Sequence, residues 1–153
     1  MLILRNRQRT RSVNLRSLRR TARTLLEELL HLPRYDLGIY LVAAPEMTHL
    51  NETFLHHHGS TDVITFDYLE PDWPTEPAEV APLLHGEIFI CVDEAIRQAR
   101  RFGVSWRSEV VRYLVHGLLH LRGYDDRRAA ARRRMKREEN RLVRCLVAGF
   151  SSA

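Results

Sequence analysis

The chain alternates between short apolar runs and longer stretches in which apolar residues recur every three or four positions. The short runs predict strands at residues 1–5, 37–44, 63–68 and 86–92. The longer stretches predict helices at about 15–31, 45–56, 94–102, 105–122 and 127–148. Because strands and helices mix over one short chain, we expect an α+β (mixed α/β) fold, with about four strands in one mixed sheet and about five helices.

Polar residues and glycines mark several of the predicted helix ends. Asp93 is a suitable N-cap for the helix at 94–102, and Gly103 is a suitable stop. Ser105 is a suitable N-cap for the next helix. The last helix is expected to turn inward a stripe formed by Met135, Leu142, Cys145 and Leu146. Residues 70–85 carry four prolines and no clear period, which predicts a surface loop.

The first 26 residues contain eight arginines and no acidic residue, a composition that resembles a transit peptide. However, residues 1–5 are typical of a short strand. Apolar residues then follow at helical spacing, namely Leu15, Leu18, Ala22, Leu25, Leu26 and Leu29. A first strand and a first helix explain the segment without cleavage, so we interpret it as part of the fold.

Composition narrows the class of protein. A chain of 153 residues is most economically a single domain over 1–153, and 44% apolar with 28% charged residues is ordinary for a soluble globular protein. No apolar run approaches the ~20 residues that span a bilayer, so we expect no membrane partner. Cys91 and Cys145 lack the spacing of a thiolate zinc site, and we interpret them as buried thiols in a reducing, cytoplasmic setting.

The net charge of +5 and the pI of about 9.8 arise almost entirely from arginine. Such a balance favours an anionic partner, and nucleic acid is the first candidate. Many of these arginines lie in the predicted last helix at 127–148. That segment holds Arg127, Arg128, Arg132, Arg133, Arg134, Lys136, Arg137, Arg141 and Arg144.

The segment "VHGLLHLRGYDDR" at 115–127 holds the strongest candidate chemistry. His116 and His120 are four residues apart on the polar stripe of a predicted central helix, so both imidazoles can reach one ion. Gly123 can adopt the left-handed conformation that reverses the chain, which would return Asp126 to the same face. Two histidines, one carboxylate and an open fourth position are the ligand set of a catalytic zinc ion. The alternative is that both histidines satisfy backbone groups in a mixed core and that Gly123 is an ordinary helix stop.

The stretch His116-Gly-Leu-Leu-His120-Leu-Arg-Gly123-Tyr-Asp125-Asp126 is similar to the signature H-G-x-L-H-L-x-G-Y-D-H of the YbeY endoribonucleases. "LNETFLHHHGSTDVITF" at 50–66 and "HGEIFIC" at 85–91 also resemble segments of that family. The order of elements agrees from about residue 2 to 148. The resemblance implies a zinc-dependent enzyme of ribosomal RNA maturation and ribosome quality control in bacteria.

Two positions depart from the family pattern. Asp126 stands where the family has its third histidine ligand, and its negative charge should leave the bound water less acidified and allow other divalent metals. Leu55 stands where the family usually has an arginine considered important for activity, and leucine cannot donate to a phosphate. His56, His57 and His58 follow immediately, and we consider them as substitutes that bind substrate.

The resemblance implies hydrolysis of single-stranded RNA phosphodiesters in 16S rRNA maturation, with one Zn²⁺ activating a water. Arg127 and Arg128 are expected to contact RNA phosphates. Ribosomal RNA is then the expected substrate, and the ribosome or ribosomal proteins are the expected partners.

Two other functions compete with this interpretation. The spacing also resembles the metzincin pattern H-E-x-x-H-x-x-G-x-x-H/D, in which a glutamate is the general base. Gly117 occupies that position here, which argues against a zincin-like metalloprotease. The second alternative is a ribosome-associated RNA-binding factor whose catalysis is weak or lost, which both Leu55 and Asp126 make credible.

Overall fold

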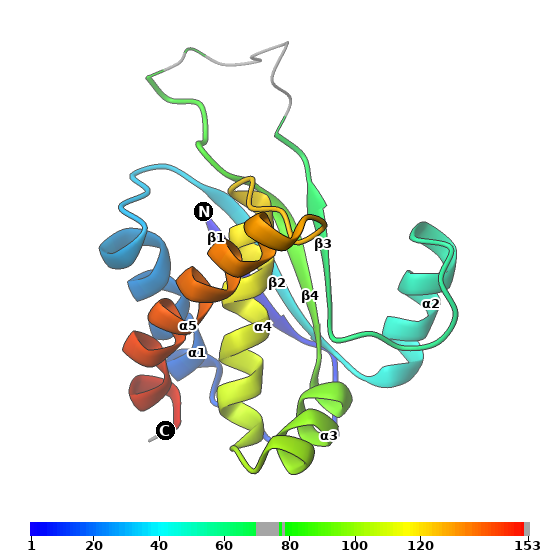
Figure 1. Cartoon of the computed structure of the whole chain (residues 1–153). Helices are drawn as coiled ribbons and strands as arrows, with labels where there is room; N and C mark the ends of the chain where they lie inside the picture. The colour runs from blue at the N-terminus through cyan, green and yellow to red at the C-terminus, as the bar shows by residue number, and fades with distance from the viewer. Residues whose placement is uncertain (70–76, 78, 152–153) are drawn as a thin grey trace.

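The fold is organised around one four-stranded sheet (Figure 1). The structure is a computed structural model, and it describes residues 1–69, 77 and 79–151. Its strands are β1 (Leu2–Asn6), β2 (Asp36–Val42), β3 (Val63–Asp67) and β4 (His85–Cys91), in the order β1-β2-β4-β3. β1, β2 and β4 are parallel, and β3 runs antiparallel to β4. The predicted mixed sheet of four strands is therefore confirmed.

Helices connect and cover these strands. They are α1 (Leu15–Arg23), α2 (Ala44–Phe54), α3 (Val92–Phe102), α4 (Trp106–Leu121) and α5 (Ala129–Ser151). The helix expected over 15–31 is present in two parts, because α1 continues into the π-helical segment η1 (Thr24–Leu29). The arginine-rich N-terminal segment is part of the fold, since β1 pairs with β2 along its whole length.

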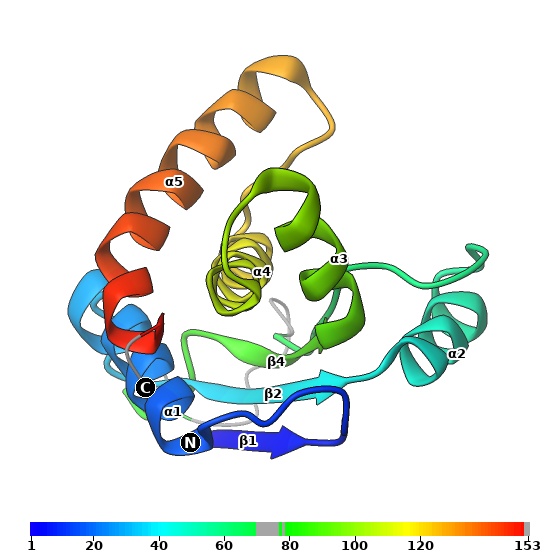
Figure 2. The ribbon, with the colours of Figure 1, turned by 90° about the horizontal axis from the view of Figure 1, so that it is seen from below.

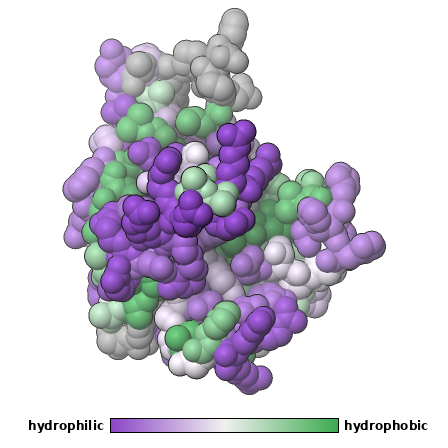
Figure 3. Space-filling view, viewed as in Figure 1, coloured by the Kyte–Doolittle hydropathy of each residue, from purple (hydrophilic) through white to green (hydrophobic). Residues whose placement is uncertain are grey.

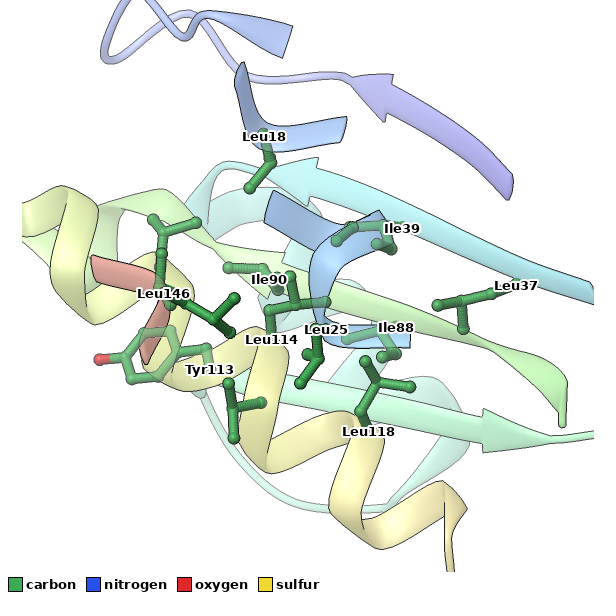
Figure 4. Close-up of a cluster of buried hydrophobic side chains, with 14 of the residues drawn as sticks. Leu18, Leu25, Leu37, Ile39, Ile88, Ile90, Tyr113, Leu114, Leu118 and Leu146 are labelled. Carbon is green, nitrogen blue, oxygen red and sulfur yellow. The ribbon is translucent and has the colours of Figure 1, made fainter. Parts of the chain in front are cut away.

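The main core lies between one face of the sheet and helices α1, α4 and α5. Leu4, Ile39 and Ile88 occupy one row across β1, β2 and β4. The apolar stripe of α4 packs against this face, with Leu114 and Leu118 fully buried (Figure 4). Figure 2 shows α4 over the sheet, flanked by α3 on one side and α5 on the other. A helix that is apolar over most of its surface is accordingly enclosed on most sides.

The opposite face of the sheet has a smaller cluster of its own. Phe89 of β4 stacks on Tyr40 of β2, with ring centroids 4.7 Å apart, and Phe66 of β3 meets Phe89 edge-on. Met47 of α2 completes this cluster, so α2 covers only one end of that face. Figure 1 shows α2 standing apart from the other helices.

Two predictions about single residues are wrong. Asp93 does not cap its own helix, which starts at Val92. Instead, its carboxylate accepts from the backbone N–H of Ala44, at 2.6 Å, and so caps α2. Cys91 is buried as expected, but Cys145 is exposed, and Val143 is buried on α5 in its place. In both cases a tertiary contact decides the outcome, and the local sequence does not specify that contact.

The expected loop at 70–85 falls partly outside the described residues, which exclude 70–76 and 78. Its last residue, His85, belongs to β4. Across the described part of the chain, no helix is both long enough and apolar enough to cross a lipid bilayer.

Candidate metal centre

Helix α4 carries both candidate histidines on a rigid support. Ser105 caps it as predicted, because its Oγ accepts from the N–H of Ser108 at 3.1 Å. The buried stripe fixes the rotation of α4 against the sheet, which leaves His116 and His120 on the outer side, 28% and 30% exposed. Side chains four residues apart lie one above the other on a helix. The two imidazole rings accordingly lie 4.6 Å apart, edge to face.

The turn after α4 brings in the third donor. Gly123 has φ +94°, a left-handed conformation that non-glycine residues rarely adopt. The N–H of Gly123 donates to the His120 carbonyl and that of Tyr124 to the Leu119 carbonyl, both at 3.0 Å. These two hydrogen bonds satisfy carbonyl groups at the end of α4, and the turn reverses the direction of the chain. Asp126 returns to the histidines, as the spacing predicted.

The three donor atoms are spaced as one ion requires. His116 Nε2 and His120 Nε2 are 3.0 Å apart, and Asp126 Oδ2 lies 3.5 Å from His120 Nε2 and 3.9 Å from His116 Nε2. A tetrahedral zinc ion with bonds of about 2.0–2.2 Å separates its ligand atoms by about 3.3–3.6 Å. The observed triangle meets this geometry after shifts of a few tenths of an ångström, so the group can hold a metal ion.

Hydrogen bonding on the far side of each ring fixes which nitrogen faces the centre. His116 Nδ1 lies 2.8 Å from Oε1 of Glu139, and His120 Nδ1 lies 3.2 Å from the carbonyl of Tyr124. A carboxylate and a carbonyl only accept, so both Nδ1 atoms carry the proton and donate. A ring that carries only this proton presents a lone pair at Nε2. Two lone pairs and a carboxylate oxygen therefore converge, and this arrangement favours a cation among them.

Glu139 on α5 is a functional residue that sequence reasoning missed. Its carboxylate is buried, and besides His116 it accepts from Arg112 at 2.6 Å and from Lys136 at 2.9 Å. Burial alone would raise the pKa of Glu139, but these hydrogen bonds outweigh it and bring the pKa down to about 2. Glu139 is therefore ionised and holds the His116 ring from behind. The spacing of 23 residues between them carries no recognisable signal.

A cleft of about 410 Å³ opens beside the three donors. His116 and Asp126 line it together with residues from three helices, including Phe102, Glu109, Arg132 and Glu139. Glu109 is buried here, and burial raises its pKa because the charged form loses water. The cleft thus places basic and acidic side chains within reach of a molecule bound at the donor triangle.

The remaining predicted site residues lie on exposed segments. His56, His57 and His58 follow α2 in the connection to β3, and His56 has φ +57°. Arg127 and Arg128 lie in the turn before α5, where the Arg127 N–H donates to Asp125. Among the described residues, none of these five lines the cleft. Their contact with substrate stays a prediction.

The family model described as "Endoribonuclease YbeY" matches residues 3–146, which is nearly the whole chain. The chain belongs to the endoribonuclease YbeY family. The resemblance drawn from the 116–126 signature is thereby confirmed. Because endoribonucleases are hydrolases, membership also assigns the chain to an enzyme class.

Individual relatives agree with membership in the YbeY family. A protein named Endoribonuclease YbeY from Geobacter metallireducens is 32% identical over 143 residues, which is 92% of each chain. Another of that name, from Chlorobium phaeovibrioides, is 38% identical over 106 residues, or 69% of this chain and 65% of the relative. The solution structure of TM1509 from Thermotoga maritima has a TM-score of 0.69 at 24% identity and covers 99% of this chain and 93% of that one, so it shares the fold.

Gly117, the position that separates this signature from the metzincin pattern, faces the sheet. A Cβ there would lie 3.0 Å from Cγ2 of Ile88 and 3.1 Å from Cγ2 of Thr65. The glycine therefore allows α4 to approach the side chains of β3 and β4. A longer side chain at 117 would meet the sheet.

Proposed function

We propose that this member of the YbeY family is a zinc-dependent endoribonuclease that cleaves single-stranded RNA. Its proposed setting is 16S rRNA maturation and ribosome quality control in the cytoplasm, with ribosomal RNA as substrate and the ribosome or its proteins as partners. The observation that carries the proposal is the convergence of two imidazole lone pairs and the Asp126 carboxylate on one point beside an open cleft. Family membership supports the reaction class.

The residues of the candidate metal centre have separate tasks in this proposal. His116, His120 and Asp126 would hold the ion, and Glu139 would keep the His116 ring turned toward it. A zinc ion bound there would supply Lewis acidity toward the phosphodiester and the attacking water. Asp126 lowers the net charge of the centre, so manganese or another harder divalent ion is an acceptable substitute.

Arg132 is the side chain best placed to hold an RNA phosphate. It is exposed on α5 and lines the same cleft as His116. Within the described chain, no hydrogen bond or ion pair engages its guanidinium, whereas Arg141 is paired with Glu138. Figure 3 shows hydrophilic side chains gathered over the face formed by α5. A basic face around a cleft favours a polyanion that passes through it.

A ribosome-associated RNA-binding factor with weak catalysis is the second candidate function. Leu55 favours it, because this side chain is 41% exposed at the end of α2 where the family signature leads us to expect an arginine. The metalloprotease alternative loses support, since Gly117 faces the sheet and provides no general base.

Cleavage of labelled RNA tests the proposal. The protein is stripped with a chelator, restored with one equivalent of zinc, and incubated with single-stranded and double-stranded RNA of the same sequence. We expect zinc-dependent cleavage of the single strand, which His116→Ala abolishes. Equal cleavage by wild type and His116→Ala would overturn the nuclease proposal. RNA binding without cleavage in the zinc-restored wild type would favour the binding factor.

A further inference from the structure

Glu109 on α4 is a buried carboxylate that the chemistry above does not use. Its residue is 7% exposed, and the side chain lines the cleft. No hydrogen bond or ion pair to it exists in the described part of the chain, although the other buried glutamates, Glu94 and Glu139, both have partners. Among the described residues, no buried side-chain oxygen lacks a hydrogen-bond partner, so the Glu109 oxygens reach the cleft, where the charges of Arg112 and Lys136 act on them. A ligand in the cleft can therefore supply hydrogen-bond donors to this carboxylate.

The distance of Glu109 from the metal centre suits a nucleotide. Glu109 and His116 are seven residues apart on α4, so they lie on the same face about two turns apart. With a rise of 1.5 Å per residue, their Cα atoms are separated by about 10 Å along the helix. This is about the reach from a phosphate to the far edge of its base. A phosphate at His116 would therefore direct a neighbouring base toward Glu109.

Two side chains of α3 that line the same cleft as Glu109 suit a flat heterocycle. Phe102, at the end of α3, lines the cleft, and this residue is 63% exposed. Gln98, one turn earlier on α3, adds an amide to the same wall. Exposed aromatic rings beside polar side chains are what single-stranded RNA binders use to stack a base and read its edge.

We propose that the part of the cleft between α3 and α4 is a nucleobase subsite that selects guanine. In it, the Glu109 carboxylate accepts from guanine N1–H and the N2 amino group, and Phe102 stacks on the ring. A carboxylate offers two acceptors side by side. Guanine presents two adjacent N–H donors on its Watson–Crick edge, whereas each of the other bases places an acceptor beside its donor. The subsite rests on the proposed function, because it assumes that RNA enters the cleft.

Mapping of cleavage positions tests the subsite. A random pool of single-stranded RNA is digested by the zinc-restored wild type, by Glu109→Gln and by the control Glu138→Gln, which alters a half-buried glutamate on α5 that does not line the cleft. We expect wild type and Glu138→Gln to prefer phosphodiesters next to guanine by at least about fivefold, as a good bidentate contact provides. Glu109→Gln should lose this preference and still cleave. No base preference in the wild type would overturn the inference.

A second measurement separates this inference from the proposed nuclease activity. Binding of the four nucleoside monophosphates is followed by NMR on the full chain, without turnover. We expect guanosine monophosphate to bind several-fold more tightly than the others and to perturb signals of Phe102. Phe102→Ala should weaken binding of all four nucleotides while retaining the guanine preference. Preferential guanosine monophosphate binding without any RNA cleavage would support the subsite and refute the nuclease. Cleavage with equal binding of all four nucleotides would do the opposite.

Discussion

Replacement of Glu139 by glutamine should weaken zinc binding while leaving the fold in place. The carboxylate accepts from His116 Nδ1 at 2.8 Å and is itself only 3% exposed, so water cannot replace it. Glutamine keeps the shape of the side chain and removes its charge. The His116 ring then loses the ionic acceptor that fixes its tautomer and raises its basicity as a ligand.

The expected magnitude follows from the geometry of this contact. Loss of a hydrogen-bonded partner behind a ligating histidine costs about 10–100-fold in metal affinity. This corresponds to about 1.4–2.7 kcal/mol of binding free energy. Arg112 and Lys136 also lose their anionic partner, so we expect the free energy of unfolding of the zinc-free protein to fall by about 1–3 kcal/mol.

Competition with a chromophoric chelator measures the zinc affinity. Glu138→Gln is the matched control, because Glu138 lies beside Glu139 in the sequence and pairs with Arg141 away from the metal centre. Circular dichroism in the presence of chelator confirms that each variant is folded. Nitrogen-15 shifts of the His116 ring should report a protonated Nδ1 in the zinc-free wild type and a mixture of tautomers in Glu139→Gln. Unchanged zinc affinity in a folded Glu139→Gln protein would refute the reasoning.

Three further predictions concern stability and metal choice. Gly117→Ala should lower the free energy of unfolding by about 1–2 kcal/mol, because overpacking against the sheet exceeds the gain in helix propensity. The control Gly149→Ala meets open space and should have no cost, so equal denaturant midpoints for the two variants would contradict the prediction. The pKa of Glu109 is raised in the folded state, so its ionised form destabilises the protein. Glu109→Gln should therefore melt at a higher temperature than wild type at pH 7–8, and the difference in melting temperature should close as the pH falls below about 4.5. A difference that widened in acid would contradict this prediction. Asp126→His should favour zinc over manganese more strongly than the wild type does. Competitive metal titration measures this preference, and an unchanged ratio of zinc to manganese affinity would contradict the prediction.

The donor triangle could be predicted because its determinants are local in sequence. His116, His120, Gly123 and Asp126 lie within one helix and its closing turn, so helical geometry and one left-handed glycine suffice. The strands and helices were predicted for the same reason, since each carries its own apolar period. Element ends moved by one to three residues, where caps and neighbouring elements decide.

Contacts across the fold could not be predicted. Glu139 reaches His116 only because α5 packs along α4, and Asp93 caps α2 because the start of α3 lies beside it. The π-helical turn at Thr24–Leu29 has no sequence signal of its own. Cys145 matched the period of the inward stripe, but α5 is rotated so that Val143 is buried instead. Packing between elements determines each of these features.

The closing turn at Gly123 has a consequence for the order of assembly. All three donors lie within eleven consecutive residues, so they come together as soon as α4 and its turn form. A chain that is still folding would then be able to bind an ion before its last helix docks. Docking of α5 would add Glu139 behind His116, so binding of the ion and its reinforcement would be separate events.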